Sequence, residues 1–492
     1  MAVTHNYLAI DLGAESGRTI IGTLDGRRLK LTETHRFVNG PVRLNDGLHW
    51  DVLRLWSDIK EGLGKSSSQV GNSLDSIGLD TWGVDFALLD KNGALLSNPF
   101  HHRDERTDGM LDEAFKCMSR AEIFNNTGIQ FMQINTLYQL LAMVLQKSPL
   151  FDIAKNFVTI PDLFNYWLSG EITNEFTNAT TTQCFDPHKR IWSTTILEAF
   201  NIPSHIFKPV TDSGTSIGTL RPSLAEEIGT GAIPILLPAC HDTGSAVVAI
   251  PAENQDFAWI SSGTWSIMGL EANQPVVNER ALEYNFTNEG GVFGTWRLSK
   301  NIMGLWLVQE CRREWARQGE ELSFDALTQL ATESEPFVSL IDPDFAEFLH
   351  PGDMPFRIQK YCADTNQGVP QTKGEILRVV LESIASKYRL VLERLEELTG
   401  KHLDPIHIIG GGTKNRLLNQ WTANSTGRTV ITSPVEATAI GNILMQAIGM
   451  NHLGSLADAR EVVRASFEPE VYEPNQTADW DEAYSRLQKI MN

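Results

Sequence analysis

Two stretches of the sequence share one pattern of apolar and polar positions, and they lie about 250 residues apart. The first runs from Tyr7 to Ile21 and the second from Phe257 to Met268. Each consists of an apolar run, a short turn rich in Gly, Ser and Thr, and a second apolar run. This pattern is typical of a β-hairpin. We therefore expect a β-hairpin near the start of each half of the chain.

The tips of both hairpins have a composition suited to phosphate binding. They present backbone N–H groups and small hydroxyls without bulky side chains, and concave turns of this kind bind anions. One such tip carries little information, but two at equivalent places predict two similar domains that close on one nucleotide. We expect residues 1–248 to form the first domain, residues 249–450 the second, and residues 451–492 a helical segment that packs back on the first domain.

The rest of the chain alternates between strand and helix patterns, which indicates an α/β protein. Apolar residues at helical spacing predict a long amphipathic helix over about 374–399, and Gly400 fits its C-terminal cap. A shorter helix is expected over 52–64 and a helix rich in Gly and Ala over 436–449. Strands are expected at 76–80, 233–239, 406–409 and 428–432.

Composition narrows the classes of function. The 492 residues carry a net charge of −20. This charge argues against nucleic acid as a partner, because a protein that binds nucleic acid needs a basic face. An acidic protein that binds a polyphosphate must supply local backbone dipoles and a metal ion, although the acidity is equally consistent with solubility alone. The five cysteines show no disulfide or zinc spacing, and we see no apolar run of membrane length and no signal segment. We expect a cytoplasmic protein that binds neither nucleic acid nor a membrane.

Asp11 ends the first strand of the N-terminal hairpin, directly before the glycine turn. It either bonds to its own backbone in an Asx turn or holds Mg²⁺ or the waters of Mg²⁺. The second interpretation follows because a carboxylate beside a phosphate-binding turn cannot contact phosphate favourably.

Asp242 lies in the segment His241–Ala246, after an apolar strand and near an expected helix N-terminus. It either caps that helix or accepts the proton of a hydroxyl that attacks a γ-phosphate.

The turn Gly410–Gly412 follows a strand and tolerates close contact. It either receives the flat face of a base or simply leads to the next helix, and Asn415 and Asn419 offer polar contacts beyond it.

The segment 80–86 places two carboxylates beside an aromatic residue at a strand end, a combination that suits a sugar. The charged run Arg103–Arg106 follows, and it is either part of that site or a solvated network of ion pairs.

Taken together, the sequence resembles the FGGY carbohydrate kinases of the actin-like ATPase superfamily. The two hairpins are shared by the whole superfamily. Three other segments are similar to the branch that acts on L-rhamnulose: Asp-Thr-Trp-Gly-Val-Asp-Phe, Asn-Ala-Thr-Thr-Thr-Gln and Lys-Asn-Ile-Met-Gly-Leu-Trp. The resemblance covers residues 7 to about 445. The matching segments are 11–18, 80–86, 128–131, 135–140, 177–183, 241–243, 261–266, 287–291, 300–306 and 410–412.

This resemblance implies two actin-like (ribonuclease H-like) domains with a central cleft, the sugar site and catalytic base in the first domain and the nucleotide site in the second. The implied reaction transfers the γ-phosphate of ATP, with Mg²⁺, to the 1-hydroxyl of L-rhamnulose or a related ketose. Asp242 would be the base and Asp11 the partner of Mg²⁺, usually through water in the family pattern. The ketose would contact Gly83, His241, Asp242, Thr243 and Asn301. ATP would contact Ala14, Glu15, Ser16, Gly17, Arg18, Thr264, Gln309, Gly410, Gly411 and Gly412.

Two residues depart from the pattern of the family. Glu15 stands in the phosphate turn where this branch commonly has a small residue, and we expect its side chain to face solvent. His102 precedes Arg103 where the family pattern has an aromatic residue such as Tyr.

Other functions share parts of the pattern. Kinases for L-fuculose, xylulose or glycerol would keep the hairpins and the His-Asp-Thr segment and differ in the sugar pocket. An actin-like sugar sensor would bind without turnover, and an Hsp70-like ATPase would lack the sugar segments. We expect a monomer or a small homo-oligomer.

Overall fold

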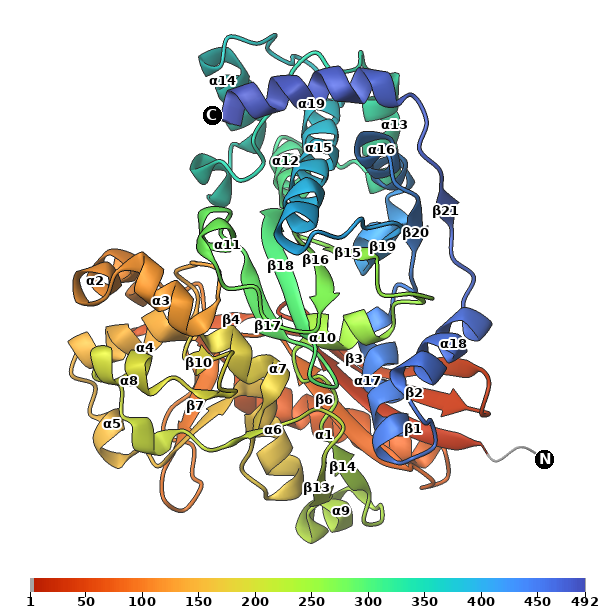
Figure 1. Cartoon of the computed structure of the whole chain (residues 1–492). Coiled ribbons are helices and arrows are strands. Elements are labelled where there is room, and N and C mark those ends of the chain that lie inside the picture. The colour runs from red at the N-terminus through yellow and green to blue at the C-terminus, as the bar shows by residue number, and fades with distance from the viewer. Residues whose placement is uncertain (1–3, 492) are drawn as a thin grey trace. The chain divides into compact units, whose positions relative to one another are not determined.

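The structure is a computed structural model that describes residues 4–491. The chain forms two compact units, which we call unit 1 and unit 2. Unit 1 holds residues 4–253, 271–298 and 436–468, and unit 2 holds residues 254–270, 299–435 and 469–491. In Figure 1, the blue helices α17 and α18 lie beside the red strands of unit 1, so residues from both ends of the sequence build this unit.

Unit 1 is built on a six-stranded sheet in the order β13-β14-β6-β1-β2-β3. β1 pairs antiparallel with β2 and parallel with β6. β1 and β2 form the N-terminal hairpin that the sequence predicts, and β1 is buried from Tyr7 onward. The strands of unit 1 are β1 (His5–Leu12), β2 (Ser16–Leu24), β3 (Leu29–Val38), β4 (Pro41–Leu44), β5 (Gly47–Trp50), β6 (Ser76–Thr81), β7 (Phe86–Leu89), β8 (Asn156–Thr159), β9 (Asn174–Glu175), β10 (Phe185–Asp186), β11 (Ile191–Trp192), β12 (Val210–Thr211), β13 (Ser216–Thr219), β14 (Pro234–Leu236) and β17 (Thr287–Gly290).

Helices pack against this sheet: α1 against β2 and β3, α6 against β6 and β13, and α17 against β1 and β6. α1 begins at Val52 as expected but continues past the predicted end to Gln69. The helices of unit 1 are α1 (Val52–Gln69), α2 (Met110–Cys117), α3 (Arg120–Thr127), α4 (Thr136–Leu145), α5 (Leu150–Ile153), α6 (Ile160–Ser169), α7 (Phe176–Ala179), α8 (Thr194–Ala199), α9 (Pro222–Ile228), α10 (Asp242–Val248), α11 (Glu279–Glu283), α17 (Ala437–Gly449) and α18 (Leu456–Ser466).

The glycines of unit 1 let α17 approach its neighbours closely. A Cβ atom on Gly441 would lie 1.8 Å from the carbonyl oxygen of Ser245 in α10, and one on Gly22 would lie 2.5 Å from Ile443. Such contacts leave no room for a side chain, which explains the Gly- and Ala-rich composition of α17.

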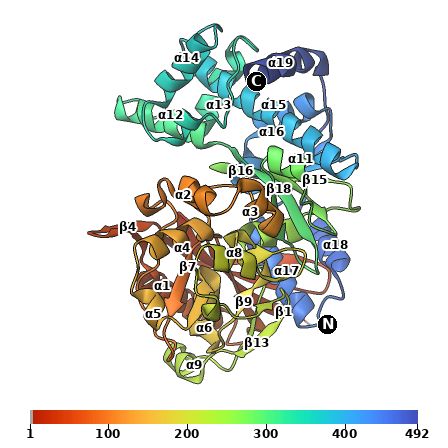
Figure 2. The ribbon, with the colours of Figure 1, turned by 60° about the vertical axis from the view of Figure 1, so that its left-hand side comes forward.

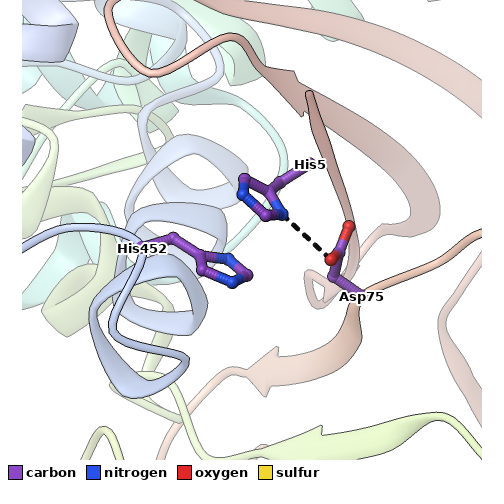
Figure 3. Close-up of side chains that lie close together, drawn as sticks. All are labelled: His5, Asp75 and His452. Carbon is purple, nitrogen blue, oxygen red and sulfur yellow. Dashed lines mark hydrogen bonds and ion pairs between the residues drawn. The ribbon is translucent and has the colours of Figure 1, made fainter. Parts of the chain in front are cut away.

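A cluster of His5, Asp75 and His452 fastens the turn after α17 to β1 (Figure 3). His5 Nδ1 lies 3.0 Å from Asp75 Oδ1, and His452 Nδ1 lies 2.5 Å from the Tyr7 hydroxyl. The two imidazole rings stack with centroids 3.5 Å apart. Because the nitrogen lone pairs lie in the ring planes, two stacked rings do not direct them at one cation. We therefore interpret the cluster as a structural contact.

Unit 2 contains the second predicted hairpin, formed by β15 and β16, and β15 pairs parallel with β19. These strands belong to a sheet in the order β17-β18-β16-β15-β19-β20-β21, and β16 and β18 each run from one unit into the other. The strands introduced here are β15 (Ala258–Ser262), β16 (Trp265–Ala272), β18 (Trp296–Met303), β19 (Ile406–Ile409), β20 (Val430–Thr432) and β21 (Val471–Tyr472).

The long predicted helix is α15, around which α13, α16 and α19 pack (Figure 2). Thr372 and Glu375 form a capping box at its start, and Gly400 ends it in the left-handed conformation with φ 66°, as the sequence predicts. The helices of unit 2 are α12 (Trp306–Arg317), α13 (Phe324–Glu333), α14 (Met354–Asp364), α15 (Lys373–Thr399), α16 (Arg416–Thr426) and α19 (Thr477–Met491).

The C-terminal segment divides between the units: α18 packs on β3 and α10 in unit 1, whereas α19 packs on α15 and α16 in unit 2. Within residues 4–491, no helix combines the length and apolar composition that crossing a membrane requires.

The close packing of α17 on α10 gives a testable prediction. Gly441→Ala places a Cβ against the α10 backbone, so we expect it to lower the free energy of unfolding by about 1–3 kcal/mol, the usual cost of overpacking. Gly64→Ala in α1 is the matched control, because its Cβ meets only an ordinary 3.5 Å contact with Ile228. Alanine favours a helix over glycine, so the control should gain up to about 1 kcal/mol. Equal effects in denaturant unfolding would contradict this packing.

Candidate active site

Three carboxylates meet in unit 1 where β1, β6 and α10 come together. Asp11 in β1 is the register partner of Asp80 in β6. The next residue of β6, Thr81, pairs with His241, and Asp242 is the first residue of α10. The structure thus brings together the ends of three segments from distant parts of the sequence.

Asp11 is not free to turn, because Arg18 holds it from the opposite strand of the hairpin. Arg18 donates from Nε and Nη2 to Asp11 Oδ2, at 2.9 and 2.8 Å. Its Nη1 forms an ion pair with Glu436 at the start of α17. Burial acts to lower the pKa of Arg18, but Asp11 and Glu436 outweigh it and raise the pKa. Arg18 therefore remains a cation beside the predicted phosphate turn.

Asp80 is fully buried and has one partner in the described structure. Asn442 in α17 donates to Asp80 Oδ2 at 2.5 Å, while Oδ1 has no hydrogen-bond partner among the described residues. Burial, and then the charges of Asp11 and Asp242, raise the pKa of Asp80 well above its usual value. Asp80 thus accommodates its burial by favouring the protonated form.

Asp242 has a different environment, with 32% of its side chain open to solvent. Thr243 donates to Asp242 Oδ1 from its backbone N–H at 2.5 Å and from its hydroxyl at 3.1 Å. Loss of water around the carboxylate, followed by the charge of Asp11, raises the pKa of Asp242 to about 6. The carboxylate is therefore ionised at neutral pH and has one open side at which a ligand could approach.

His241 lies beside Asp242 and close to Gly83. A Cβ on Gly83 would sit 3.2 Å from His241 Nε2 and 3.1 Å from the Thr181 side chain. On the other side of the ring, Arg297 Nη2 lies 2.8 Å from His241 Nδ1. Gly83 thus keeps open a gap in front of His241 that any larger residue would narrow.

The residue after Gly83 has a strained backbone. Val84 adopts φ 66°, a conformation that a β-branched residue rarely adopts. Its N–H donates to Thr181 Oγ1 at 3.1 Å, and its carbonyl accepts from Thr136 Oγ1 at 2.5 Å and Gln139 Nε2 at 3.3 Å. These bonds hold the strained turn in place and so fix the gap beside His241.

Asp85 closes the same turn as a buried hydrogen-bond hub. Its Oδ2 accepts from Trp50 Nε1 at 2.7 Å, Trp82 Nε1 at 2.9 Å and His102 Nδ1 at 2.8 Å, and its Oδ1 accepts from Gln139 Nε2 at 3.0 Å. Burial acts to raise the pKa of Asp85, but His102 and the indole donor outweigh it, so the pKa is lowered. His102 thus belongs to an ordered cluster of aromatic rings.

The tip of the N-terminal hairpin is fixed by a residue that the sequence did not single out. Asn39 donates from Nδ2 to the Gly13 carbonyl at 2.8 Å and from its backbone N–H to the Glu15 carbonyl at 3.0 Å. Ala14 and Glu15 are exposed, so Glu15 faces solvent as expected. With two of its carbonyl groups bonded to Asn39, the tip is held in one conformation.

In unit 2, the second hairpin tip packs against the glycine turn. A Cβ on Gly412 would lie 2.0 Å from Ser262 Oγ, and one on Gly410, where φ is 83°, would lie 3.1 Å from the Ser262 carbonyl. A Cβ on Gly411 would meet nothing within 4 Å. Two of the three glycines are therefore required by close packing, and the third leaves an open surface.

The other predicted residues of unit 2 are placed as follows. Thr264, at the hairpin tip, donates to Gln309 Oε1 of α12 at 3.3 Å. Asn301 lies in β18. Asn415 caps α16, and Asn419 donates to the Thr413 carbonyl at 2.9 Å, so both amides support the backbone after the glycine turn.

Sequence reasoning missed four residues of these sites: Asn39, Arg297, Glu436 and Asn442. Each acts on a predicted site residue from a distant segment. Glu436 alone had a local signal, as the acidic residue directly before the Gly- and Ala-rich helix.

Comparison with solved structures defines the class of the fold. The structure matches a gluconate kinase from Lactobacillus acidophilus with a TM-score of 0.84, at 16% sequence identity over 100% of this chain and 98% of that one. It also matches the structure of a glycerol kinase from Plasmodium falciparum that was solved with ADP. The TM-score of this match is 0.79, at 16% identity over 98% of both chains. The expected α/β fold with two actin-like domains is confirmed.

Sequence comparison defines the family. Residues 6–249 match the N-terminal domain and residues 258–450 the C-terminal domain of the FGGY family of carbohydrate kinases. The chain belongs to this family, and it is an ATP-dependent carbohydrate kinase. It is 42% identical to a rhamnulokinase of Bacteroides thetaiotaomicron, over 97% of this chain and 98% of that protein. It is 38% identical to a rhamnulokinase of Bacillus subtilis, over 95% of each.

The buried hub at Asp85 can be tested by its effect on stability. Asp85→Ala leaves two indole N–H groups and one amide without their acceptor, so we expect a loss of about 3–5 kcal/mol in the free energy of unfolding. Asp46→Ala is the control, because Asp46 is 67% exposed and pairs with His49 at 3.1 Å, a surface contact worth about 0–1 kcal/mol. A loss at Asp85 as small as that of the control would show that the hub is not required.

Proposed function

We propose that this kinase transfers the γ-phosphate of ATP to the 1-hydroxyl of L-rhamnulose, giving L-rhamnulose 1-phosphate in the breakdown of L-rhamnose. The observation that carries the proposal is the identity of 37–42%, over nearly the whole chain, to several proteins named rhamnulokinase. The reaction would take place in the cytoplasm, where ATP is supplied, and the enzyme would act as a monomer or small homo-oligomer.

Asp242 would be the general base. A base works best when its pKa lies close to the working pH, and the pKa of about 6 leaves Asp242 ionised at pH 7 yet able to accept a proton. Its partly open side chain gives the 1-hydroxyl access. As the 1-oxygen attacks the γ-phosphorus, Asp242 would take its proton, which increases the charge on the attacking oxygen.

The sugar would contact Gly83, His241, Thr243 and Asn301 as well as Asp242. The ring of His241 and the gap at Gly83 support this assignment, because His241 lies beside the carboxylate that would act as base and Gly83 faces His241. His102 and the indole of Trp82, which both donate to Asp85, would form the aromatic side of the sugar site.

ATP would contact Ala14, Glu15, Ser16, Gly17 and Arg18 in unit 1, and Thr264, Gln309 and Gly410–Gly412 in unit 2. In unit 1, Arg18 is the side chain that brings positive charge to the hairpin. Glu15 would take part through its backbone, since its side chain is exposed. In unit 2, the open surface at Gly411 suits the flat adenosine.

Mg²⁺ would be held by Asp11, through water. The residues fit a hard cation, because Asp11 and Asp80 are register partners and Asp80 Oδ1 is buried without a hydrogen-bond partner among the described residues; a bound cation would shift Asp80 to its ionised form. When bound, Mg²⁺ offsets the charge of the transferred phosphoryl group. Arg18, which bridges Asp11 and Glu436, would orient Asp11 for this task.

The role of Asp242 predicts a loss of turnover in Asp242→Asn. This change keeps the shape of the side chain and removes the base, so kcat should fall about 10²–10⁴-fold with little change in the KM for ATP. Asp212→Asn makes the same change at a side chain that is 71% exposed and forms an ion pair with Arg190, and it should keep kcat within about two-fold. A kcat near that of the wild type in Asp242→Asn would refute the assignment of the base.

The choice of sugar is tested by ADP release with ATP, Mg²⁺ and a panel of L-rhamnulose, L-fuculose, L-xylulose, D-xylulose and glycerol. We expect a clear preference for L-rhamnulose. Preference for another member of the panel would reject the proposed substrate and leave the family intact. Turnover of none would favour a sugar sensor.

A further inference from the structure

The geometry points to Arg297 as a positioning residue that places the single ring proton of His241 on Nε2, so that His241 donates a hydrogen bond into the sugar site. The placement of the proton follows from contacts within unit 1. Its use on a sugar oxygen rests on the proposed function.

The first step concerns which atoms can donate. Arg297 Nη2 lies 2.8 Å from His241 Nδ1, and both side chains are buried. A guanidinium carries donors only, so Nδ1 must accept this hydrogen bond and cannot itself carry a proton. In a neutral imidazole the proton then resides on Nε2.

The second step is that Arg297 cannot easily turn away. Its Nε donates to the Gly290 carbonyl at 2.9 Å, and its Nη2 lies 3.0 Å from Glu289 Oε2. Arg297 is 1% exposed, so the guanidinium is held on three sides. The position of its charge beside Nδ1 is therefore fixed by the fold.

Glu289 is the group that could favour the opposite tautomer, since its Oε2 lies 3.4 Å from His241 Nδ1. A proton on Nδ1 would point at that carboxylate, but it would also face the N–H of Arg297 at 2.8 Å. The shorter contact decides between the two, because two facing donors repel each other. The ring also stays neutral, since burial and then the charge of Arg297 keep the pKa of His241 well below its usual value.

The third step is where the proton points. His241 Nε2 lies 3.5 Å from Asp242 Oδ1 and faces the gap at Gly83. A donor at this place can hold a ketose oxygen next to the base. Because Nδ1 is occupied by Arg297 and Nε2 carries a proton, His241 has no free lone pair with which to accept the proton of the 1-hydroxyl. Asp242 is then the acceptor of the pair, and His241 orients the sugar.

The tautomer can be read directly by ¹⁵N NMR of the ligand-free protein labelled at histidine. The His241 signals are assigned by their loss in His241→Asn. At pH 7.5 we expect the shifts and couplings of an Nε2–H imidazole, unchanged down to pH 5.5. An Nδ1–H ring or an imidazolium would overturn the inference. This result does not depend on any activity, so it separates a failure here from a failure of the proposed function.

Kinetics test the positioning role. The double change Arg297→Met with Glu289→Gln removes the interaction without leaving either charge unpaired. We expect the two tautomers of His241 to exchange in this variant. The KM for L-rhamnulose should rise about ten-fold, because one hydrogen bond to the sugar is lost, and the KM for ATP should not change. Arg280→Met with Glu283→Gln makes the same change in an exposed pair and is the matched control. If the double variant keeps the Nε2–H tautomer and the wild-type KM for L-rhamnulose, the proposed role of Arg297 is wrong. If the double variant does not fold, the spectrum of the wild-type protein still decides which tautomer His241 adopts.

Discussion

The constraint on which unit 1 depends is the placement of carboxylates side by side at the ends of two parallel strands. Asp11 and Asp80 are partners in β1 and β6, and both are buried. A buried carboxylate is costly unless it is paired, hydrogen-bonded or protonated. The structure uses all three means: Arg18 pairs with Asp11, Asn442 donates to Asp80, and the pKa of Asp80 rises.

This constraint accounts for the return of the chain to unit 1 near its C-terminus. α17 contributes Glu436, which holds Arg18, and Asn442, which holds Asp80. These contacts need the helix to lie close to β1, β6 and α10, and the glycines Gly22, Gly78 and Gly441 permit that approach. The close packing of α17 therefore also places the two side chains that stabilise the buried carboxylates. Asp242 and His241 lie at its edge, where one acid stays ionised and one base stays neutral.

Much of the fold and of the candidate site could be predicted from the sequence, and the limits of that prediction have a physical cause. The hairpins, the helix that starts at Asp242 and the cap at Gly400 depend on local patterns, and all three are confirmed. The exposure of Glu15 was expected for an electrostatic reason and is also confirmed. The contacts of Asn39 and Arg297 join segments 26 and 56 residues apart, and no local pattern encodes them. No local pattern encodes the division of the C-terminal segment between the two units either, because it depends on the tertiary surface against which each helix packs.

The central claim is that burial, followed by the charge of Asp11, raises the pKa of Asp242 to about 6 and thereby suits it to be the base. The most direct measurement is the pH dependence of kcat/KM for L-rhamnulose at saturating Mg²⁺ and ATP, from about pH 5 to pH 9. A base must be deprotonated to work, so the account predicts a level profile above neutral pH and a fall of about ten-fold per pH unit below about pH 6. The residual activity of Asp242→Asn should lack this acid limb. A wild-type profile that stays level down to pH 5, or an acid limb that persists in the variant, would contradict the claim.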